Sequence, residues 1–338
     1  MLTVSVIIPT YNRAHLISRA IRSAVANLLP GDEILVVDDA STDNTAEVVA
    51  RCPGPVSYLR TVHGGAGAAR NRGLEAARGD LVAFLDSDDE WYPDKLRLQR
   101  TLLERKPEVL YCFSDFRSRE ESGAEEGRFL RHWHKDARSW DEILAPGVWF
   151  STIADLPDGR EDFRVHVGDM FTAEMRSNYI ATSTTVIRRR QAGAALRFAE
   201  DWTISEDKAC FARVAGRGLG AYLDCETSIQ WGHSGPRLSN SNVGAMVEAR
   251  LTLLKEVWEP NAEFMARHGD ELRRVRSELL LKRARWHLAR GDMRAARNDL
   301  RQVEHCPLAY RLSARVPSLV ARPLLALRRW LKSHAALS

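Results

Sequence analysis

Three acidic residues stand within four positions at the end of a short apolar run. In VAFLDSDDEWYPDKL, residues 82–96, the acids are Asp86, Asp88 and Asp89, and we call residues 86–89 the DSDD segment. Carboxylates this close repel one another, so a packed core would not tolerate them without a positive partner. Asp86 and Asp88 project to the same side while the chain stays extended, which suits one divalent cation. The plainer alternative is a set of acids that cap a turn or a helix.

Two other apolar runs also end in polar residues. Residues 4–9 lead into PTYNR, and residues 33–39 end in Asp39. In open parallel sheets, ligands bind where strands end at their carboxyl edge. We therefore expect Asp39 and the DSDD segment on one rim of a sheet. A Mg²⁺ or Mn²⁺ ion, which combines one or two carboxylates with phosphates, would neutralise these acids and leave positions open for a diphosphate.

A glycine-rich stretch, HGGAGAARNRG at residues 63–73, opens a predicted helix. Gly64, Gly65 and Gly67 could let the backbone approach a phosphate. Arg70 stands where the dinucleotide fingerprint has its third Gly or Ala, so a nicotinamide-binding site is not favoured. On the first turn of the helix, Arg70 would point cationic donors toward a nucleotide pocket. The alternative is an exposed helix arginine.

The elements that must position these residues alternate between strand and helix. Short β-branched or apolar runs predict buried strands, and helical periodicity separates them. The predicted strands cover residues 4–9, 33–39, 56–61 and 80–86, with helices at 14–28, from 41 and after the glycine loop. This alternation predicts an α/β fold with a mostly parallel sheet flanked by helices on both faces.

The pattern loosens in the middle of the chain and then becomes helical. Residues 117–178 are rich in charge, Gly and Trp without clean periodicity, so we expect a long insertion with short helices that is prone to disorder. Ordered elements are expected again from residue 179. From Val243 onward helices are expected, with a hairpin turned at Gly291-Asp292 that is similar to a single tetratricopeptide-type unit.

The composition bounds the class of protein. The chain has 338 residues, 44% hydrophobic and 28% charged, which suits one or two globular domains with a large core. A net charge of +4 is too small to imply nucleic-acid binding. Five widely spaced cysteines without a CxxC pair favour neither a disulfide framework nor a zinc site, so a reducing cytoplasm is expected. The sequence has no apolar run of about 18 residues and no signal-peptide pattern at its N-terminus.

The C-terminal region is strongly basic. From Glu271 to Ser338 there are 16 Lys and Arg against 5 Asp and Glu. Apolar residues of the tail, such as Leu324, Leu327 and Trp330, alternate with arginines, which is typical of a helix lying in a membrane interface. A peripheral contact with the inner face of the cell membrane is therefore one expectation. A helix that docks on a partner protein or on the chain itself is the other.

Four stretches resemble, in order and spacing, the family 2 glycosyltransferases of the GT-A fold. They are VSVIIPTYNR, EILVVDDASTDNT, GAGAARNRGLEAARGDLVAFLDSDDEWYPDKL and SEDKACFARVA. The likeness is dense over residues 3–113, returns at about 180–235 and is absent from the C-terminal helices. It implies a GT-A-type sheet and an inverting transfer of a sugar from a nucleotide-diphosphate sugar, UDP-sugar first, with Mn²⁺ or Mg²⁺. The implied acceptor is a glycan or a lipid-linked sugar, in the biosynthesis of a surface or secreted polysaccharide.

The resemblance also implies domains and donor contacts. A glycosyltransferase domain would cover residues 1–240, with a donor half to about 115 and an acceptor half from about 116, and an all-helical extension would cover 241–338. Tyr11 would stack on the base, Asp39 would accept from a base ring N–H, and Asp88 and Asp89 would lie at the ribose and the metal. The implied donor-nucleotide contacts are Pro9, Thr10, Tyr11, Arg13, Asp39, Arg70, Asp86, Ser87 and Asp88.

A loop near the end of the resemblance, IQWGHSGPRLSN at residues 229–240, adds two candidates. His233 would be a further metal ligand, and Arg237 would contact the diphosphate. For both, a solvated loop side chain is the alternative.

A second acid pair, Glu206 and Asp207, stands at the start of the helix predicted at 205–218. In the resemblance it matches the acid motif on the acceptor side, which supplies the catalytic base. Inversion at an anomeric carbon in one displacement needs the acceptor hydroxyl to lose its proton as it attacks. Asp207 is the first choice for this base and Glu206 the second. The alternative is that Ser205 caps the helix and that the helix dipole favours the acids.

Two tryptophans are weaker candidates for the site, and three other functions are compared with the glycosyltransferase. Trp202 and Trp231 could stack on sugar faces, and core packing is the alternative for both. A nucleotidylyltransferase is not favoured because the first loop lacks a glycine- and lysine-rich motif. A DxDxT phosphatase is not favoured because Asp89 and Glu90 follow Asp88. The remaining alternative is a non-catalytic nucleotide-sugar or glycan-binding module with a helical interaction tail.

Overall fold

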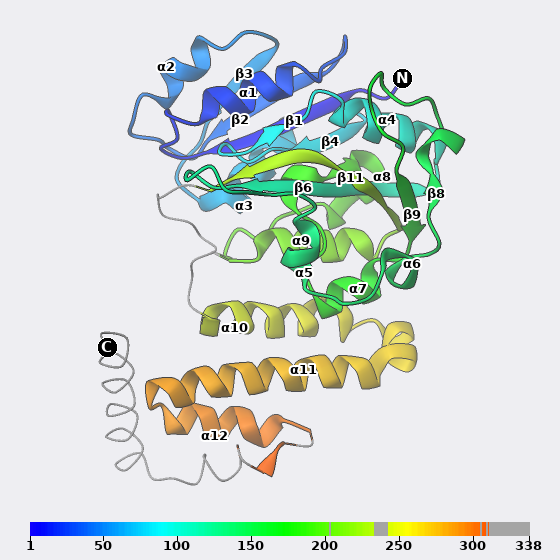
Figure 1. The fold of residues 1–338 in the computed structure, drawn as a ribbon. Helices are drawn as coiled ribbons and strands as arrows, with labels where there is room; N and C mark the ends of the chain where they lie inside the picture. Colours follow the sequence, from blue (N-terminus) through cyan, green and yellow to red (C-terminus); the bar gives the residue numbers. More distant parts are fainter. Residues whose placement is uncertain (203, 233–242, 305, 309, 311–338) are drawn as a thin grey trace. The chain divides into compact units, whose positions relative to one another are not determined.

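The computed structural model describes residues 1–338 apart from 203, 233–242, 305, 309 and 311–338. The chain divides into two compact units, residues 1–235 and 236–338 (Figure 1). The first unit holds a sheet flanked by helices, and the described part of the second unit is helical.

One mixed sheet organises the first unit. Its strands lie in the order β3-β2-β1-β4-β10-β6-β11-β9-β8, while β5 pairs with β11 and β7 with β6. The bounds are β1 Val4–Thr10, β2 Glu33–Asp38, β3 Val56–Arg60, β4 Leu81–Phe84, β5 Glu90–Trp91, β6 Val109–Arg119, β7 Glu125–Glu126, β8 Val148–Trp149, β9 Arg164–Gly168, β10 Val186–Arg188 and β11 Leu219–Trp231. β1 to β4 pair in parallel, whereas β10 runs antiparallel to both β4 and β6. The predicted α/β fold class is confirmed, with parallel strands in the first part of the chain and mixed directions beyond it.

Helices cover both faces of the first strands (Figure 1). They are α1 Ile17–Val25, α2 Thr45–Ala50, α3 Gly65–Ala76 and α4 Lys95–Arg105. β1 is buried along its whole length, and its alternate residues point to opposite faces. Ile8 shares a core cluster with Ile21 of α1, whereas Ile7 lies against Gly73 of α3. A Cβ at position 73 would lie 2.5 Å from Ile7 Cγ2, so this glycine allows α3 to pack closely on the sheet.

The insertion at residues 117–178 is ordered, and the expectation of disorder is corrected. Beside β7, β8 and β9 it contains α5 Leu130–His134, α6 Trp140–Ile143, η1 Phe150–Thr152 and α7 Phe171–Arg176. Trp140 stacks on Tyr222 of β11 with ring centroids 3.8 Å apart, and the His134 ring lies 4.7 Å from that of Tyr179. Because these contacts join short elements to residues far away in the sequence, they leave no periodic pattern that could predict them.

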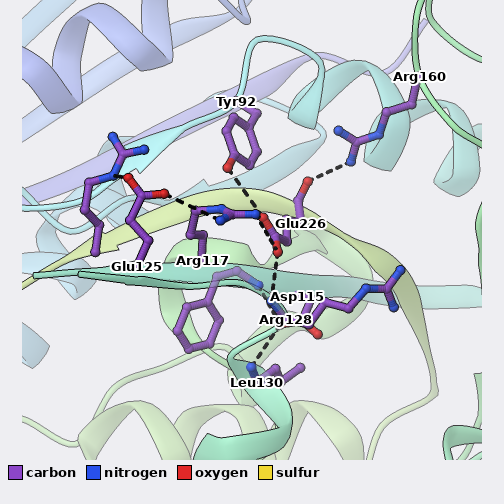
Figure 2. Close-up of polar contacts among 10 residues, drawn as sticks. Tyr92, Asp115, Arg117, Glu125, Arg128, Leu130, Arg160 and Glu226 are labelled. Carbon is purple, nitrogen blue, oxygen red and sulfur yellow. Dashed lines mark hydrogen bonds and ion pairs between the residues drawn. The ribbon is translucent and has the colours of Figure 1, made fainter. Parts of the chain in front are cut away.

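An ion-pair network around Glu226 ties this insertion to the sheet (Figure 2). Glu226 of β11 accepts from Arg117 Nε at 3.0 Å and from the backbone N–H of Arg128 at 2.8 Å. Arg160 Nη2 donates to the Glu226 carbonyl at 2.7 Å, and Arg117 Nη1 lies 3.5 Å from Glu125 of β7. Through its carboxylate and its backbone carbonyl, Glu226 therefore holds three parts of the insertion, at Arg117, Arg128 and Arg160.

The second unit is a set of packed helices. They are α10 Val243–Leu253, a π-helical turn at Leu254–Trp258, α11 Ala262–Arg290 and α12 Met293–Gln302. Gly291 ends α11 with a φ of 78°, and Asp292 caps α12 by accepting from the backbone N–H of Ala295 at 3.0 Å. Arg283 of α11 pairs with Asp299 of α12 at 2.6 Å. The predicted hairpin at Gly291-Asp292 is confirmed. The expected membrane-interface helix of the tail lies outside the described residues, and no helix of the described part is long and apolar enough to span a bilayer.

A fully buried lysine, Lys95, is the first residue of α4. Its ammonium group donates to the Thr184 carbonyl at 2.9 Å and to the side chain of Gln99, and it lies 5.0 Å from the centre of the Trp91 ring. Burial lowers the pKa of Lys95 to about 7.

The remaining elements of the first unit are η2 Thr182–Thr184, α8 Arg189–Ala192, η3 Gly193–Ala195 and α9 Glu206–Ala215.

Lys95 should make the free energy of unfolding rise with pH above neutrality. In the unfolded chain a lysine keeps its proton to about pH 10.4, so between that value and about 7 the unfolded state binds more protons than the folded state. The expected slope for this group is at most about 1.4 kcal/mol per pH unit. Urea unfolding of the wild-type protein and of Lys95→Met at pH 7, 8 and 9 measures it, because all other titrating groups are common to both. Parallel pH dependences in the two proteins would show that Lys95 stays charged in the fold.

Candidate functional site

The carboxyl ends of β1, β2 and β4 meet at one edge of the sheet. In the parallel register, Thr10 lies beside Asp38 and Ile7 lies beside Phe84. The segments PTYNR, DDAS and DSDD stand at the ends of these strands or directly after them, so they leave the sheet at the same edge. We call this edge, with residues 9–13, 38–41 and 86–89, the rim. Open parallel sheets bind their ligands at this edge.

Three residues near this edge hold left-handed backbone conformations. Asn12 follows β1, Ala40 follows β2 and Ser205 precedes α9, with φ values of 52°, 66° and 64°. Residues other than glycine adopt this region only when the surrounding structure holds them there, and such positions cluster at functional sites. Asn12 is held from both sides, because its Oδ1 accepts from Thr42 N at 2.7 Å and its N–H donates to Ser41 Oγ at 2.8 Å.

Asp39 is buried and binds the glycine loop. Its Oδ1 accepts from Gly64 N at 2.7 Å, and its Oδ2 accepts from Gly65 N at 2.8 Å. His63 Nδ1 lies 2.8 Å from the same carboxylate. Asp39 thus already accepts from the N–H groups of two of the three glycines that could let the backbone approach a phosphate. Gly65 has a φ of 85°, a conformation that favours glycine.

Aromatic side chains lie at the surface beside Asp39. Tyr11 is 44% exposed, and its ring centroid lies 4.6 Å from that of His63, whose side chain is 61% exposed. Val62 is also exposed next to His63. Exposed rings of this kind suit stacking of a planar base. The sequence patterns do not single out His63, although it directly precedes the glycine loop.

Other predicted donor contacts lie at the end of β1. Pro9 and Thr10 are buried there, and Thr10 Oγ1 finds no hydrogen-bond partner among the residues that the structure describes. A buried hydroxyl without a partner suits a hydrogen bond to a bound ligand. Arg13 contributes its backbone to the turn that begins α1, because its carbonyl accepts from Leu16 N at 2.9 Å.

The three acids of the DSDD segment have different surroundings. Asp86 Oδ1 accepts from Arg70 Nη2 at 2.7 Å, and Asp88 is partly exposed. Ser87 and Asp89 are buried, and Asp89 Oδ2 accepts from Ser183 Oγ of η2 at 2.6 Å. Burial, followed by the charges of Asp88 and Asp86, raises the pKa of Asp89 well above its usual range. Asp86 and Asp88 thus lie at the rim, whereas the Asp89 carboxylate faces the protein interior.

The oxygen donors of the rim fit a divalent cation. Burial raises the pKa of Asp86, and the charge of Asp88 adds to this effect against the opposing Arg70. Negative charge is therefore concentrated where carboxylate oxygens could hold Mg²⁺ or Mn²⁺. Across the described ranges, no three His, Cys, Asp or Glu side chains gather to hold a metal ion. The carboxylates of the rim thus suit an ion that takes one or two carboxylates from the protein and completes its coordination with phosphates. His233 and Arg237 lie outside the described residues.

Arg70 joins the rim to the second acid pair. Its Nη1 lies 2.9 Å from Glu206 Oε1 while its Nη2 holds Asp86, although the two acids are 120 positions apart in the sequence. The next residue of α3, Asn71, donates to the Phe198 carbonyl and accepts from the Phe198 N–H, both at 2.9 Å. Two consecutive residues of α3 therefore fix the segment that leads into α9.

Asp207 lies beside this ion pair in the first turn of α9. Its Oδ1 accepts from the backbone N–H of Lys208 at 2.7 Å, and its Oδ2 lies 3.5 Å from Thr182 Oγ1. Burial and the charge of Glu206 raise the pKa of Asp207 to about 6, while Arg70 opposes the shift. A carboxylate with this pKa is mostly ionised at neutral pH and can accept a proton. Ser205 makes no side-chain cap hydrogen bond at this helix start.

The two tryptophans have different surroundings. Both Arg19 and Arg119 lie over the Trp231 ring, with their Cζ atoms 4.2 Å and 4.8 Å from its centroid. Trp231 Nε1 donates to Glu90 Oε2 at 3.2 Å, and Arg19 Nη2 donates to the Asp88 carbonyl at 2.8 Å. Arg19 therefore links the Trp231 ring to the Asp88 backbone, and the two arginines cover a ring that is a candidate for sugar stacking. Trp202 is partly buried.

Comparison with protein families and curated proteins gives a match in the first half of the chain. Residues 5–154 match the family model described as Glycosyl transferase family 2. The succinoglycan biosynthesis protein ExoO of Rhizobium meliloti is 46% identical over 96 residues, which are 28% of this chain and 28% of that protein. The chain spans between 17% and 56% of the length of the curated relatives that it matches.

Comparison with solved structures covers most of the chain at low identity. TarS 1–349 of S. aureus, in complex with UDP-GlcNAc, has a TM-score of 0.56 and 18% identity, with 88% of this chain and 90% of that chain covered. The mannosyltransferase PcManGT of Pyrobaculum calidifontis, in complex with GDP-Man and Mn²⁺, has a TM-score of 0.53 and 18% identity over 97% of this chain and 79% of that chain. At this identity the likeness establishes the shared fold.

Proposed function

The chain belongs to glycosyl transferase family 2 through its domain at residues 5–154, and from this premise we propose how it acts. It moves a sugar from a nucleotide-diphosphate sugar to a hydroxyl of a glycan or lipid-linked acceptor, in one inverting displacement. The observation that carries the proposal is the position of Arg70, which contacts Asp86 at 2.7 Å and Glu206 at 2.9 Å. The acidic rim and Glu206, the neighbour of the proposed base Asp207, thus lie on either side of one cation.

The donor nucleotide lies along the rim in this proposal. Tyr11, with His63 beside it, stacks on the base, and Asp39 accepts from a base ring N–H through a lone pair that the glycine loop leaves unused. The backbone and side chains at the end of β1 and in the DSDD segment contact the rest of the nucleotide. These residues are Pro9, Thr10, Arg13, Asp86, Ser87 and Asp88. UDP is the first choice of nucleotide.

Asp88, with Asp86 beside it, would hold Mn²⁺ or Mg²⁺. When bound, the ion supplies charge stabilisation for the diphosphate that leaves. Asp89 is less suited to ligation because its carboxylate is buried against Ser183. The roles of His233 as a further ligand and Arg237 as a diphosphate contact stay predictions.

Asp207 is the base in this proposal. Its Oδ1 is held by the backbone of Lys208, so Oδ2 is the atom that takes the proton of the acceptor hydroxyl. Thr182 at 3.5 Å from Oδ2 helps to orient the carboxylate. Glu206 remains the second choice, since its carboxylate is engaged by Arg70.

The product of the reaction is proposed to be a surface or secreted polysaccharide, as the name of the relative ExoO suggests. A cytoplasmic location, with the basic C-terminal tail at the inner face of the membrane, would bring the site to a lipid-linked acceptor. Nucleic acid is not a proposed partner.

Titration calorimetry with UDP, GDP and dTDP tests the donor half of the proposal. We expect one nucleotide to bind in the presence of Mn²⁺, and the binding to weaken when EDTA removes the metal. If none of the three binds with Mn²⁺ present, the proposal is wrong. Release of free sugar, or its transfer to an acceptor, from the matching nucleotide sugar then separates an enzyme from a non-catalytic binding module.

A further inference from the structure

Arg70 is buried between the rim and the base, and its set of contacts is incomplete. Its side chain is about 6% exposed, and Phe198 lies over it, with 5.2 Å between Cζ and the ring centroid. Two of its nitrogens contact Asp86 and Glu206. The third, Nε, is buried and has no hydrogen-bond partner within the described part of the chain. A buried N–H without an acceptor is rare, and it indicates a place for one more acceptor.

The acceptor that fits this place is an anionic diphosphate. A guanidinium group matches phosphate oxygens in a bidentate geometry, and it binds them more strongly than a neutral donor does. Asp86, which Arg70 already holds, belongs to the segment proposed to bind the donor. A diphosphate bound at the rim would compete with Asp86 for Nη2, and a shift of the guanidinium toward the phosphate would weaken its contact with Glu206 and give Nε an acceptor.

We propose that Arg70 is a positioning residue that couples donor binding to the base Asp207. Without a donor, its guanidinium holds Asp86 and Glu206 together. When a diphosphate takes over the guanidinium, Glu206 and Asp207 lose their nearest cation, and Asp207 becomes a stronger base. The inference rests on the proposed function, and it adds that the base gains its full strength only after the donor is in place.

The charges around Asp207 set the direction of this effect. The groups that face it are Glu206 and Lys208 of α9, Arg70 of α3, Asp86 after β4 and the Thr182 hydroxyl of η2. The Lys208 ammonium lies 3.7 Å from the buried Glu174, so it is already paired. Burial and Glu206 raise the pKa of Asp207, and Arg70 lowers it. A weaker contact with Arg70 therefore raises this pKa, and the protein takes up protons as the donor binds.

Proton uptake can be measured by calorimetry without any turnover. UDP-GlcNAc and GDP-mannose serve as probes, at pH 6.5 with constant Mn²⁺, in two buffers that differ in ionisation enthalpy. The difference between the two binding enthalpies, divided by the difference between the two ionisation enthalpies, gives the number of protons taken up. We expect clear uptake in the wild-type protein and its loss in Asp207→Asn, with the probe still bound. Arg70→Gln should also lose most of the uptake, because the cation that moves is then missing.

The pH dependence of turnover gives a second measurement on the wild-type protein, which does not depend on how variants fold. The acid limb of kcat/KM for the donor reports the free enzyme, and that of kcat reports the donor complex. We expect the limb of kcat to lie about one pH unit higher. Probe binding without proton uptake, and with coincident limbs, would overturn the coupling and leave the donor proposal intact. If neither probe nor any of UDP, GDP and dTDP binds, the proposed function fails and the coupling fails with it.

Discussion

Asp207→Asn is expected to lower kcat by about 10²- to 10⁴-fold, the range that general-base catalysis contributes. Asparagine has nearly the same shape, and its side-chain oxygen can still accept from Lys208 N, as Asp207 Oδ1 does at 2.7 Å. The variant therefore keeps the helix start and loses only the atom that accepts a proton. Donor affinity should stay within a few-fold, because Asp207 lies on α9 and the proposed donor contacts lie on the rim. Initial rates, donor calorimetry and the melting temperature together measure these effects.

Glu206→Gln is the matched control for this variant. It removes a charge from the neighbouring position of the same helix, and it also weakens the contact with Arg70 at 2.9 Å. We expect a smaller loss of kcat than in Asp207→Asn, and an acid limb that moves to lower pH because Glu206 raises the pKa of Asp207. In the wild-type free enzyme the limb should lie near pH 6, with activity lost below it as Asp207 takes a proton. If Glu206→Gln loses turnover and Asp207→Asn keeps it, the two roles are reversed.

Asp88→Ala is expected to weaken metal-dependent donor binding by at least about tenfold, which corresponds to about 1.4 kcal/mol. Asp88 and Asp86 are both partly exposed at the rim, but Arg70 holds the Asp86 carboxylate, and Ser183 holds the buried Asp89. Removal of the Asp88 carboxylate takes away an oxygen ligand and one negative charge from the proposed metal site. Calorimetry with the nucleotide that binds, at several Mn²⁺ concentrations, measures the loss.

Asp94→Asn serves as the control for charge. Asp94 lies six positions further along the chain and pairs with Arg160 at 3.3 Å, outside the rim. Its loss should leave the Mn²⁺ dependence of donor binding as it is. Asp89→Asn decides between the two candidate ligands, and we expect a smaller effect on Mn²⁺ dependence than in Asp88→Ala. Equal losses in Asp88→Ala and Asp89→Asn would show that both carboxylates bind the metal.

The residues of the rim could be predicted from the sequence because each of them stands at the end of a strand or directly after it in the chain. β1, β2 and β4 are short runs of apolar residues, and the polar residues that follow them lie next to them in the sequence. Parallel pairing then brings Asp39 and the DSDD segment to one edge, as expected. The fold class could be predicted for the same reason, since alternating strands and helices repeat over the first part of the chain.

The contacts between distant segments could not be predicted in this way. The pairing of Arg70 with Glu206 spans 136 positions, and no local pattern distinguishes it from an exposed helix arginine. Gly64 and Gly65 look like phosphate-binding glycines, but their N–H groups are bound by Asp39. The insertion at 117–178 is held by aromatic stacking and by Glu226, and neither leaves a periodic signal. In each case the deciding partner comes from another element of the fold.

The network around Glu226 has a consequence for protein engineering. Under the proposed function the insertion at 117–178 lies in the acceptor half, so it is the segment to exchange between related chains in a test of acceptor choice. Glu226 belongs to β11 and is retained in such a chimera. Its carboxylate accepts from Arg117 Nε and from the N–H of Arg128, so the graft must supply equivalent donors. A graft without an equivalent cation and turn would leave a mostly buried carboxylate unpaired, which is costly. Successful chimeras should therefore begin after Arg117 and keep the turn at Arg128, or replace Glu226 by a neutral residue at the same time.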